Sequence, residues 1–362
     1  MDRAPARQGA GVTPHPGAWW LWALCLAAVA TRTTNPVLLA LVVAVAGYVA
    51  VSCRPDTPWA GAYGVFLKFG LAVIAVRVVF HVLLGGVAGP TVLFTLPSVP
   101  LPGWARGIRL GGPVSAEGLV FALYHGLQLA TLLCCVGAAN ALANAKRLLR
   151  SLPAALYEVS VAVVVALTVA PQLVTSARSV RRARALRGDA VRGIRALRVL
   201  AVPVLEDAFE RSLVLAAAMD SRGYGRTAGL PRSARALTGV LVLGGLGGLC
   251  LGAYGLLDGS APPLVGAPVL AVGAALAVAG LWTGSRRVRR SRYRPDTWGP
   301  RELLIVGAGL VAALATFLAP ADLGGDALTP GTSPLVVPGL PLLPALGLLC
   351  ALAPVLVDRK RA

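Results

Sequence analysis

The feature that most constrains the fold of this chain is a series of continuous apolar runs. Several of them reach the roughly 20 residues that cross a bilayer as a helix. The runs are rich in Ala, Leu and Val, whereas the strands of a membrane β-barrel alternate apolar and polar residues. Charged residues make up only 14% of the chain, against about 25% in a soluble domain. The sequence therefore predicts an all-α polytopic membrane protein.

The apolar runs predict about eight membrane segments. Placing both termini in the cytoplasm puts almost all Lys and Arg inside, as the positive-inside rule expects. The chain then divides into N-terminal membrane helices over 1–140, a cytoplasmic region over 141–235 and C-terminal membrane helices over 236–362. The predicted segments are 18–30, 36–52, 61–87, 117–140, 236–257, 264–283, 303–320 and 335–357.

The net charge of +19 has two explanations, nucleic acid binding or the gathering of Lys and Arg in cytoplasmic loops. The second is favoured in a membrane protein, so the expected partner is the lipid bilayer and not nucleic acid. No metal site is expected. The six cysteines form no C-x-x-C pair, and nearby His ligands are lacking.

Three local signals concern single helices and loops. Thr34-Asn35-Pro36 predicts a helix start, because a capping side chain precedes a Pro at the first helical position. The Gly/Pro-rich stretch 88–116 predicts a loop. In segment 61–87, Arg77 and His81 lie four residues apart on one helix face. Such charges can mark function, but snorkelling and packing against partner helices is favoured, since no acidic residue of the segment pairs with them.

The apolar run 157–174 is long enough to cross the membrane, but it lies between two Arg-rich clusters, 142–150 and 178–198. If the run crossed completely, these clusters would lie on opposite sides of the membrane. The positive-inside rule favours a shared cytoplasmic side. We therefore expect this run to dip into the membrane or to lie along its interface.

The basic insert from about Pro171 to Arg226 contains a predicted amphipathic helix over 204–222. The helix is expected to stop at Gly223, a residue suited to the left-handed position past a helix end. Arg222 then lies in the last turn, where a cation complements the helix dipole. The predicted apolar face follows the i, i+3, i+4, i+7 spacing. Its residues are Leu205, Ala208, Phe209, Ser212, Leu213, Ala216 and Met219.

A second helix with the same kind of ending is predicted over about 172–187, with Arg187 before Gly188. Its apolar stripe of Leu173, Ala177 and Val180 is weaker, and several arginines crowd its polar side. One Arg-Gly step is an ordinary helix ending with a dipole-compensating Arg. Two of them in one cytoplasmic insert favour a docking surface, because a guanidinium binds a carboxylate through two parallel hydrogen bonds.

At these residues the chain resembles the transmembrane T component of energy-coupling factor (ECF) transporters, the CbiQ-like family, which carries Ala-Arg-Gly-type motifs at the ends of two long coupling helices. The resemblance covers about 115–257 well and the first hundred residues loosely. Leu186 and Ser221 stand at the alanine positions of the motifs, so only Arg and Gly carry over. The residues that carry the resemblance are Pro171-Gln172-Leu173, Arg184-Ala185-Leu186-Arg187-Gly188, Arg211-Ser212-Leu213 and Ala218-Met219-Asp220-Ser221-Arg222-Gly223-Tyr224-Gly225.

The resemblance implies a non-catalytic scaffold in the bacterial plasma membrane. Arg187-Gly188 and Arg222-Gly223 would dock into two ATP-hydrolysing subunits. The apolar faces of the coupling helices would hold a substrate-binding membrane subunit that releases a vitamin or a metal ion such as cobalt. No cofactor is implied. Consistent with this, none of the three lysines follows a glycine, as the Lys of a phosphate-binding P-loop would.

Three other classes of protein remain as alternatives. A secondary transporter would need intramembrane carboxylates or inverted repeats, and Glu117 at a segment edge is the only acidic candidate. An ordinary ABC permease would carry one coupling motif per half instead of two in a single insert. A membrane enzyme is disfavoured, because no cluster of His, Asp and Glu or activated nucleophile is evident.

Overall fold

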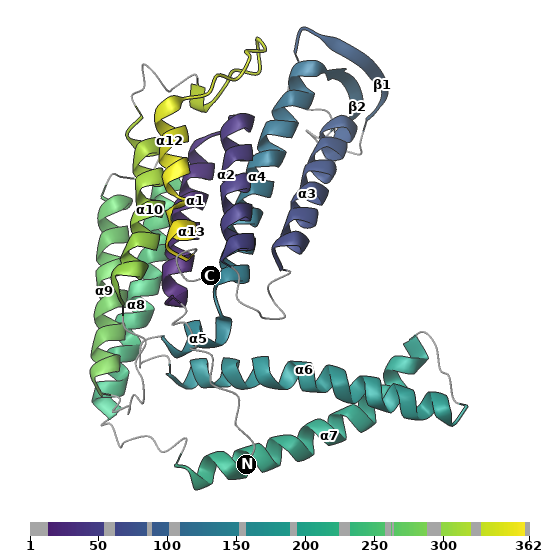
Figure 1. Ribbon diagram of the computed structural model, residues 1–362, viewed down its shortest axis with the longest axis vertical. Coiled ribbons are helices and arrows are strands. Elements are labelled where there is room, and N and C mark those ends of the chain that lie inside the picture. Colours follow the sequence, from purple (N-terminus) through teal and green to yellow (C-terminus); the bar gives the residue numbers. More distant parts are fainter. Residues whose placement is uncertain are drawn as a thin grey trace, which may run out of the picture. The chain divides into compact units, whose positions relative to one another are not determined.

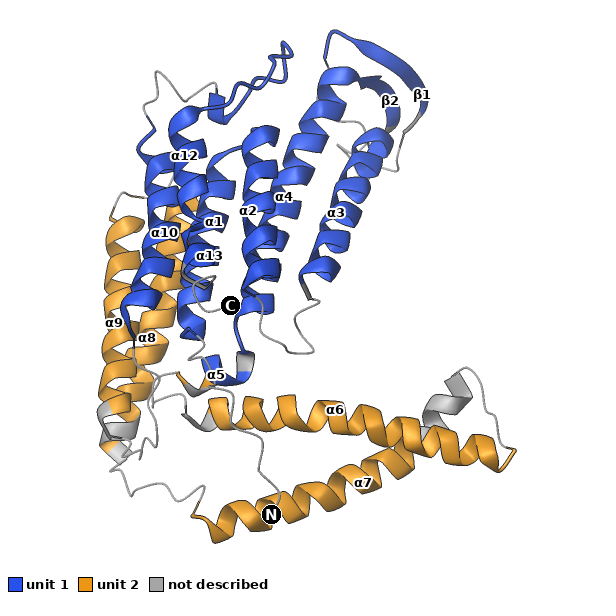
Figure 2. Ribbon diagram, viewed as in Figure 1, with its two compact units in different colours: residues 1–148, 296–362 blue, residues 149–295 orange. Residues whose placement is uncertain are grey.

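The computed structural model confirms the predicted all-α membrane fold class (Figure 1). The residues that the structure describes are 14–53, 62–84, 89–100, 109–151, 157–188, 194–223, 232–257, 262, 264–287, 298–319 and 327–358. They form two compact units, residues 1–148 with 296–362 and residues 149–295 (Figure 2). Part of the predicted Arg cluster, residues 189–193, lies outside the described residues, as do Tyr224 and Gly225 of the second motif.

The first unit is a helical bundle built from both ends of the chain. Its helices are α1 (Pro16–Arg32), α2 (Pro36–Ser52), α3 (Ala62–Leu84), α4 (Ala116–Leu142), α10 (Pro300–Phe317), α12 (Leu342–Cys350) and α13 (Ala353–Asp358), and the short α5 (Ala145–Arg150) begins in it. Helix α1 packs against α4 and α10, and α2 packs against α4 and α12. The core lies where these helices meet, at Trp22, Leu26, Leu38, Val42, Ala138, Ala312 and Leu348.

The predicted helix start at Asn35 is confirmed, and the residue does more than cap α2. Its Oδ1 accepts a hydrogen bond from the N–H of Val37 (2.9 Å), the capping contact. Its Nδ2 donates to the carbonyl oxygens of Ala327 and Gly339, both at 2.7 Å. Asn35 is fully buried. This one side chain therefore joins the start of α2 to the segment that precedes α12.

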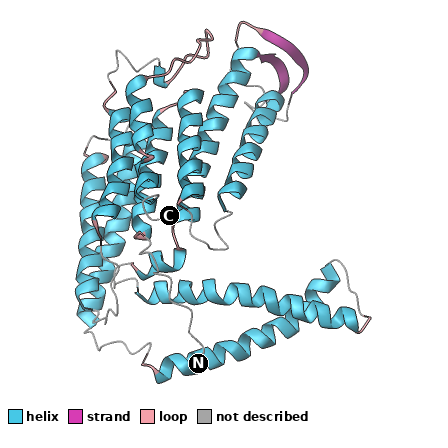
Figure 3. Cartoon of the chain, in the orientation of Figure 1, coloured by secondary structure: helices cyan, strands magenta, loops and turns pink. Residues whose placement is uncertain are grey.

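The predicted loop over 88–116 is wrong for most of its length, because β1 (Val92–Pro100) and β2 (Arg109–Ser115) form an antiparallel pair (Figure 3). The pairing shifts register between Leu96 and Val99, on either side of Pro97. A Pro has no N–H for the ladder and is tolerated at such irregular positions. The Gly/Pro-rich composition thus marks an irregular strand pair as well as a turn.

The second unit contains the two longest helices of the described chain, and both run through a proline. Helix α6 is Tyr157–Leu186 and α7 is Ile194–Ser221. The apolar run 157–174 and the predicted helix 172–187 are one helix of 30 residues, and the predicted helix 204–222 begins ten residues earlier. An internal Pro costs about 3 kcal/mol, but each further residue of a formed helix adds a hydrogen bond. Pro171 and Pro203 therefore both lie inside helices.

Six described helices have the length and apolar composition to cross a membrane. Five of them correspond to predicted segments, and the sixth is Val159–Leu186 within α6. The predicted segments 18–30, 36–52 and 335–357 correspond to shorter helices, of which α1 and α2 have 17 residues each. The interfacial placement of residues 157–174 stays a prediction.

Helices α8 (Arg232–Leu257) and α9 (Ala267–Arg287) pack on each other through glycines. A Cβ at Gly245 would lie 2.7 Å from Ala277 Cα, and a Cβ at Gly252 would lie 2.6 Å from Leu270 Cα. These approaches are too close for any side chain. Small residues of this kind let membrane helices pack backbone to backbone.

Gly245→Val is expected to destabilise the protein by about 1–3 kcal/mol, the usual cost of overpacking a close contact. The matched control is its neighbour Gly244, where an added Cβ would meet nothing within 4 Å. Gly244→Val should leave the thermal unfolding midpoint of the detergent-purified protein nearly unchanged. Equal shifts in the two variants would show that α8 and α9 do not pack at Gly245.

Candidate functional site

Helices α6 and α7 contact each other and cross, as Figure 1 shows. At the crossing, the Ser176 hydroxyl on α6 lies near enough to the Asp207 carboxylate on α7 to lower the pKa of that carboxyl. Ser176 is buried, although the stretch around it is mostly exposed. Asp207 is also held by Arg211 one turn further along α7, with Nε 2.8 Å from Oδ1. A polar contact therefore joins the two helices.

The predicted apolar stripe of the first helix packs toward this crossing. Leu173, Ala177 and Val180 are half-buried on α6, on the same face as Ser176. On α7 the half-buried side chains near Asp207 are Val204 and Ala208. Sequence reasoning missed the crossing because Ser176 is an unremarkable residue by type. Its position on the apolar stripe was the only available signal.

The polar contacts at the crossing give it an expected pH dependence. Ser176 first, and then Arg211, hold the pKa of Asp207 below its ordinary value. A depressed folded-state pKa stabilises the crossing above the unfolded pKa of about 3.9, and this contribution is lost as the pH falls below that value. Spin labels at the exposed Thr175 and Glu206 should therefore show a broader distance distribution at pH 3 than at pH 7. The change should be smaller in Asp207→Asn, and an equal change in that variant would contradict the assignment.

Most of the predicted apolar face of α7 does not lie at the crossing and is open. Leu205 is 55% exposed, Phe209 69% and Leu213 70%. Ala216 is also exposed, whereas Met219 is half-buried. Consecutive turns of α7 thus present large apolar side chains that no described part of this chain covers.

Both helices end at a glycine in the left-handed conformation, as predicted. Gly188 has φ of +84° and Gly223 has φ of +76°. An added Cβ at either position would meet nothing within 4 Å, so the backbone conformation and not the space requires glycine. The turns close through the N–H groups of Arg187 to Arg184 O (2.9 Å) and of Arg222 to Met219 O (3.1 Å).

The two arginines lie one residue past the last helical residue, and not in the last turn as predicted. Both are exposed, and Leu186 beside Arg187 is 85% exposed. Within the described part of the chain, no ion pair holds either guanidinium. We call Arg187-Gly188 and Arg222-Gly223 the two tips. Because α7 returns across α6 after a short connection, the tips lie at opposite ends of the crossed pair (Figure 1).

The two carboxylates at the edges of described membrane helices are engaged with the backbone. Glu117 at the start of α4 accepts from the N–H of Thr91 (3.3 Å). Glu302 at the start of α10 accepts from the N–H groups of His15 (3.1 Å) and Gly299 (2.9 Å). Both side chains are buried. Glu302 closes a capping box at the start of α10, a role that the sequence reasoning missed although a Gly-Pro start three residues earlier signals it. The cap of α4 is Ser115, and Glu117 bonds to Thr91 instead.

Comparison with known proteins identifies a family for the chain. The family CbiQ, described as cobalt transport protein, matches residues 13–231, which is more than half of the 362 residues. No curated protein matches the chain. The match includes both tips and stops before α8, so the later helices lie outside it. The chain is a multi-pass membrane component of cobalt and ECF-type transport, and it belongs to the CbiQ family of cobalt transport proteins.

Proposed function

We propose that this chain is the membrane scaffold of an ECF-type importer, which passes ATP-driven motion from two ATPase subunits to a substrate-binding membrane subunit. The observation that carries the proposal is the pair of exposed tips at opposite ends of the crossed helices. Two separate docking points suit two ATPase subunits. The CbiQ family description makes cobalt the first candidate cargo.

The tips have the chemistry of a docking contact. Each presents an exposed guanidinium directly before the left-handed glycine that ends the helix turn. A guanidinium binds carboxylates bidentately, so acidic grooves on the ATPase subunits are the expected sockets. ATP would be hydrolysed in those subunits, and this chain would not act as an enzyme and would need no cofactor.

The crossing makes the pair a mechanical link. From Ser176 to Arg187 α6 extends about 16 Å, and from Asp207 to Arg222 α7 extends about 22 Å, at 1.5 Å per residue. We call the part of each helix between the crossing and its tip an arm. A displacement of one tip would therefore rotate its arm about the crossing at Ser176 and Asp207. Movement of the two ATPase subunits toward each other would change the angle between the helices.

The open face of α7 is the expected binding surface for the substrate-binding subunit. Leu205, Phe209 and Leu213 are each more than half exposed. A contiguous apolar stripe on a surface helix signals a covering partner. Because this face belongs to one of the two arms, a change in helix angle would reach the partner directly.

The test is reconstitution with radioactive cobalt. Vesicles that contain this chain, the ATPase pair and the substrate-binding subunit should accumulate ⁵⁷Co²⁺ when ATP is supplied. Vesicles that contain this chain alone should not, with or without an ion gradient. Gradient-driven uptake by the chain alone would instead establish a secondary transporter, the alternative that the backbone hydrogen bonds to Glu117 and Glu302 disfavour.

A further inference from the structure

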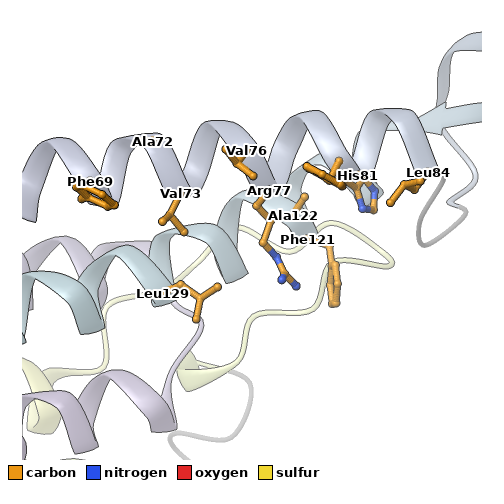
Figure 4. Close-up of a pocket in the computed structure, with 11 residues that line it drawn as sticks. Phe69, Ala72, Val73, Val76, Arg77, His81, Leu84, Phe121, Ala122 and Leu129 are labelled. Carbon is orange, nitrogen blue, oxygen red and sulfur yellow. The ribbon is translucent and has the colours of Figure 1, made fainter. Parts of the chain in front are cut away.

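Helices α3 and α4 leave an open groove with a volume of about 570 Å³ beside their contact (Figure 4). The lining of the groove follows α3 for about four turns. At 1.5 Å per residue the stretch from Phe69 to Leu84 is about 22 Å long. The lining side chains of α3 include Phe69, Val73, Val76, Phe80 and Leu84.

These five residues follow one another at intervals of four, three, four and four, so they form one apolar seam along α3. This is the arrangement through which one helix packs on another. Phe69 is 64% exposed, Val76 56% and Phe80 57%, so the seam is not covered. Helix α4 cannot cover it by moving closer. An added Cβ at Gly126 of α4 would already lie 3.3 Å from Ile74 Cα. The groove is therefore shaped for a further helix.

One charge lies in this apolar lining. Arg77 extends from α3 between Phe121 and Leu129 of α4, as Figure 4 shows. No Asp or Glu is among the residues that line the groove, and His81 supplies no anion. A charged side chain in a membrane helix is costly and is found with a partner or a water-filled cavity. An anion from outside the described residues would meet this requirement.

A second copy of this chain does not supply that anion from the described membrane helices. Their carboxylates at Glu117 and Glu302 are buried and already accept backbone hydrogen bonds. A lipid phosphate fits less well. Arg77 lies seven residues, or about 10 Å, before the end of α3, so its guanidinium would have to reach that far along the helix to meet a phosphate at the membrane surface.

We infer that the groove receives a transmembrane helix of the substrate-binding subunit, whose Asp or Glu pairs with Arg77. This inference rests on the proposed function for the identity of the partner subunit. The helix would bury the Phe69–Leu84 seam, and its carboxylate would fix the register. The open face of α7 and this groove would then be two separate contacts with one partner.

The experiment places a photo-crosslinking benzoylphenylalanine at Phe80 in the complex of the full chain, the ATPase pair and the substrate-binding subunit. The control position is Leu71, which is 71% exposed and lies nine residues earlier, on the opposite face of α3. Crosslinking at Phe80, and not at Leu71, to a helix of the substrate-binding subunit that contains Asp or Glu is expected. Crosslinking at Phe80 to lipid alone, to another protein or to nothing would overturn the inference.

Substitution of Arg77 tests the charge separately. Arg77→Leu should lower the co-purified substrate-binding subunit at least tenfold, and Arg77→Lys should retain most of it. In the Arg77→Glu variant, association should be restored when the crosslinked Asp or Glu of the substrate-binding subunit is replaced with Lys. The ATPase pair should remain bound throughout, which distinguishes this result from a failure of the tips. Unchanged association in Arg77→Leu would overturn the inference.

Discussion

Replacing Arg187 and Arg222 together with Glu is expected to abolish co-purification of the ATPase pair and ATP-dependent cobalt uptake. Each substitution replaces the guanidinium with a carboxylate, which the proposed acidic groove of the ATPase subunit would repel. Removing one partner of a buried charge pair costs about 2–5 kcal/mol of binding, so affinity should fall by a thousandfold or more. Membrane insertion and the substrate-binding subunit should be retained, since both tips are exposed and their side chains support no described contact.

The matched control for the tips is Arg181→Glu with Arg182→Glu. These arginines are also exposed on α6 and give the same change of net charge, but they lie within the helix and not at its end. The control pair should keep the ATPase subunits. Loss of the subunits from both double variants would assign docking to the general basic charge, and retention in both would contradict the proposed role of the tips.

Asn35→Leu is expected to destabilise the first unit by about 3 kcal/mol or more. The substitution removes three hydrogen bonds at once and leaves the N–H of Val37 and the carbonyls of Ala327 and Gly339 without their partner. Each unsatisfied buried polar group costs about 1–3 kcal/mol. The thermal unfolding midpoint in detergent measures the effect, and protease sensitivity near residues 327–339 should rise with it.

The control for Asn35 is Asn140→Leu, because Asn140 is exposed on α4. This variant should unfold at nearly the wild-type temperature. If Asn35→Leu were equally stable, the segment before α12 would be held by its other contacts. The main ones are the hydrogen bonds to Leu328 O from Thr33 Oγ1 (2.7 Å) and Thr34 N (3.0 Å).

Local chemistry allowed the sequence to predict most helices and the two tips. Long apolar runs have few alternatives to a helix in a bilayer, because every backbone group must be satisfied within the segment. The ends at Gly188 and Gly223 were predictable, since glycine adopts a positive φ at little cost. The start of α2 followed from a capping side chain before Pro36.

The errors have a common origin in residues whose effect depends on their surroundings. Pro171 and Pro203 lie inside helices, where the cooperativity of a long helix outweighs one lost hydrogen bond. Pro97 lies at an irregular point of a strand pair that sequence reasoning interpreted as a loop. A proline limits the local backbone, but it does not determine whether the helix or strand continues on its other side.

The sequence by itself determined the class of this protein, the helical character of its segments and the chemistry of the tips, since these depend on neighbouring residues. Only the tertiary structure decided which distant residues meet. It joined Asn35 to Ala327 and Gly339, although about 300 residues lie between them. It also crossed α6 and α7 at Ser176 and Asp207, and it left Arg77 in an open groove. Such pairings depend on the packing of whole helices, and no local pattern contains them.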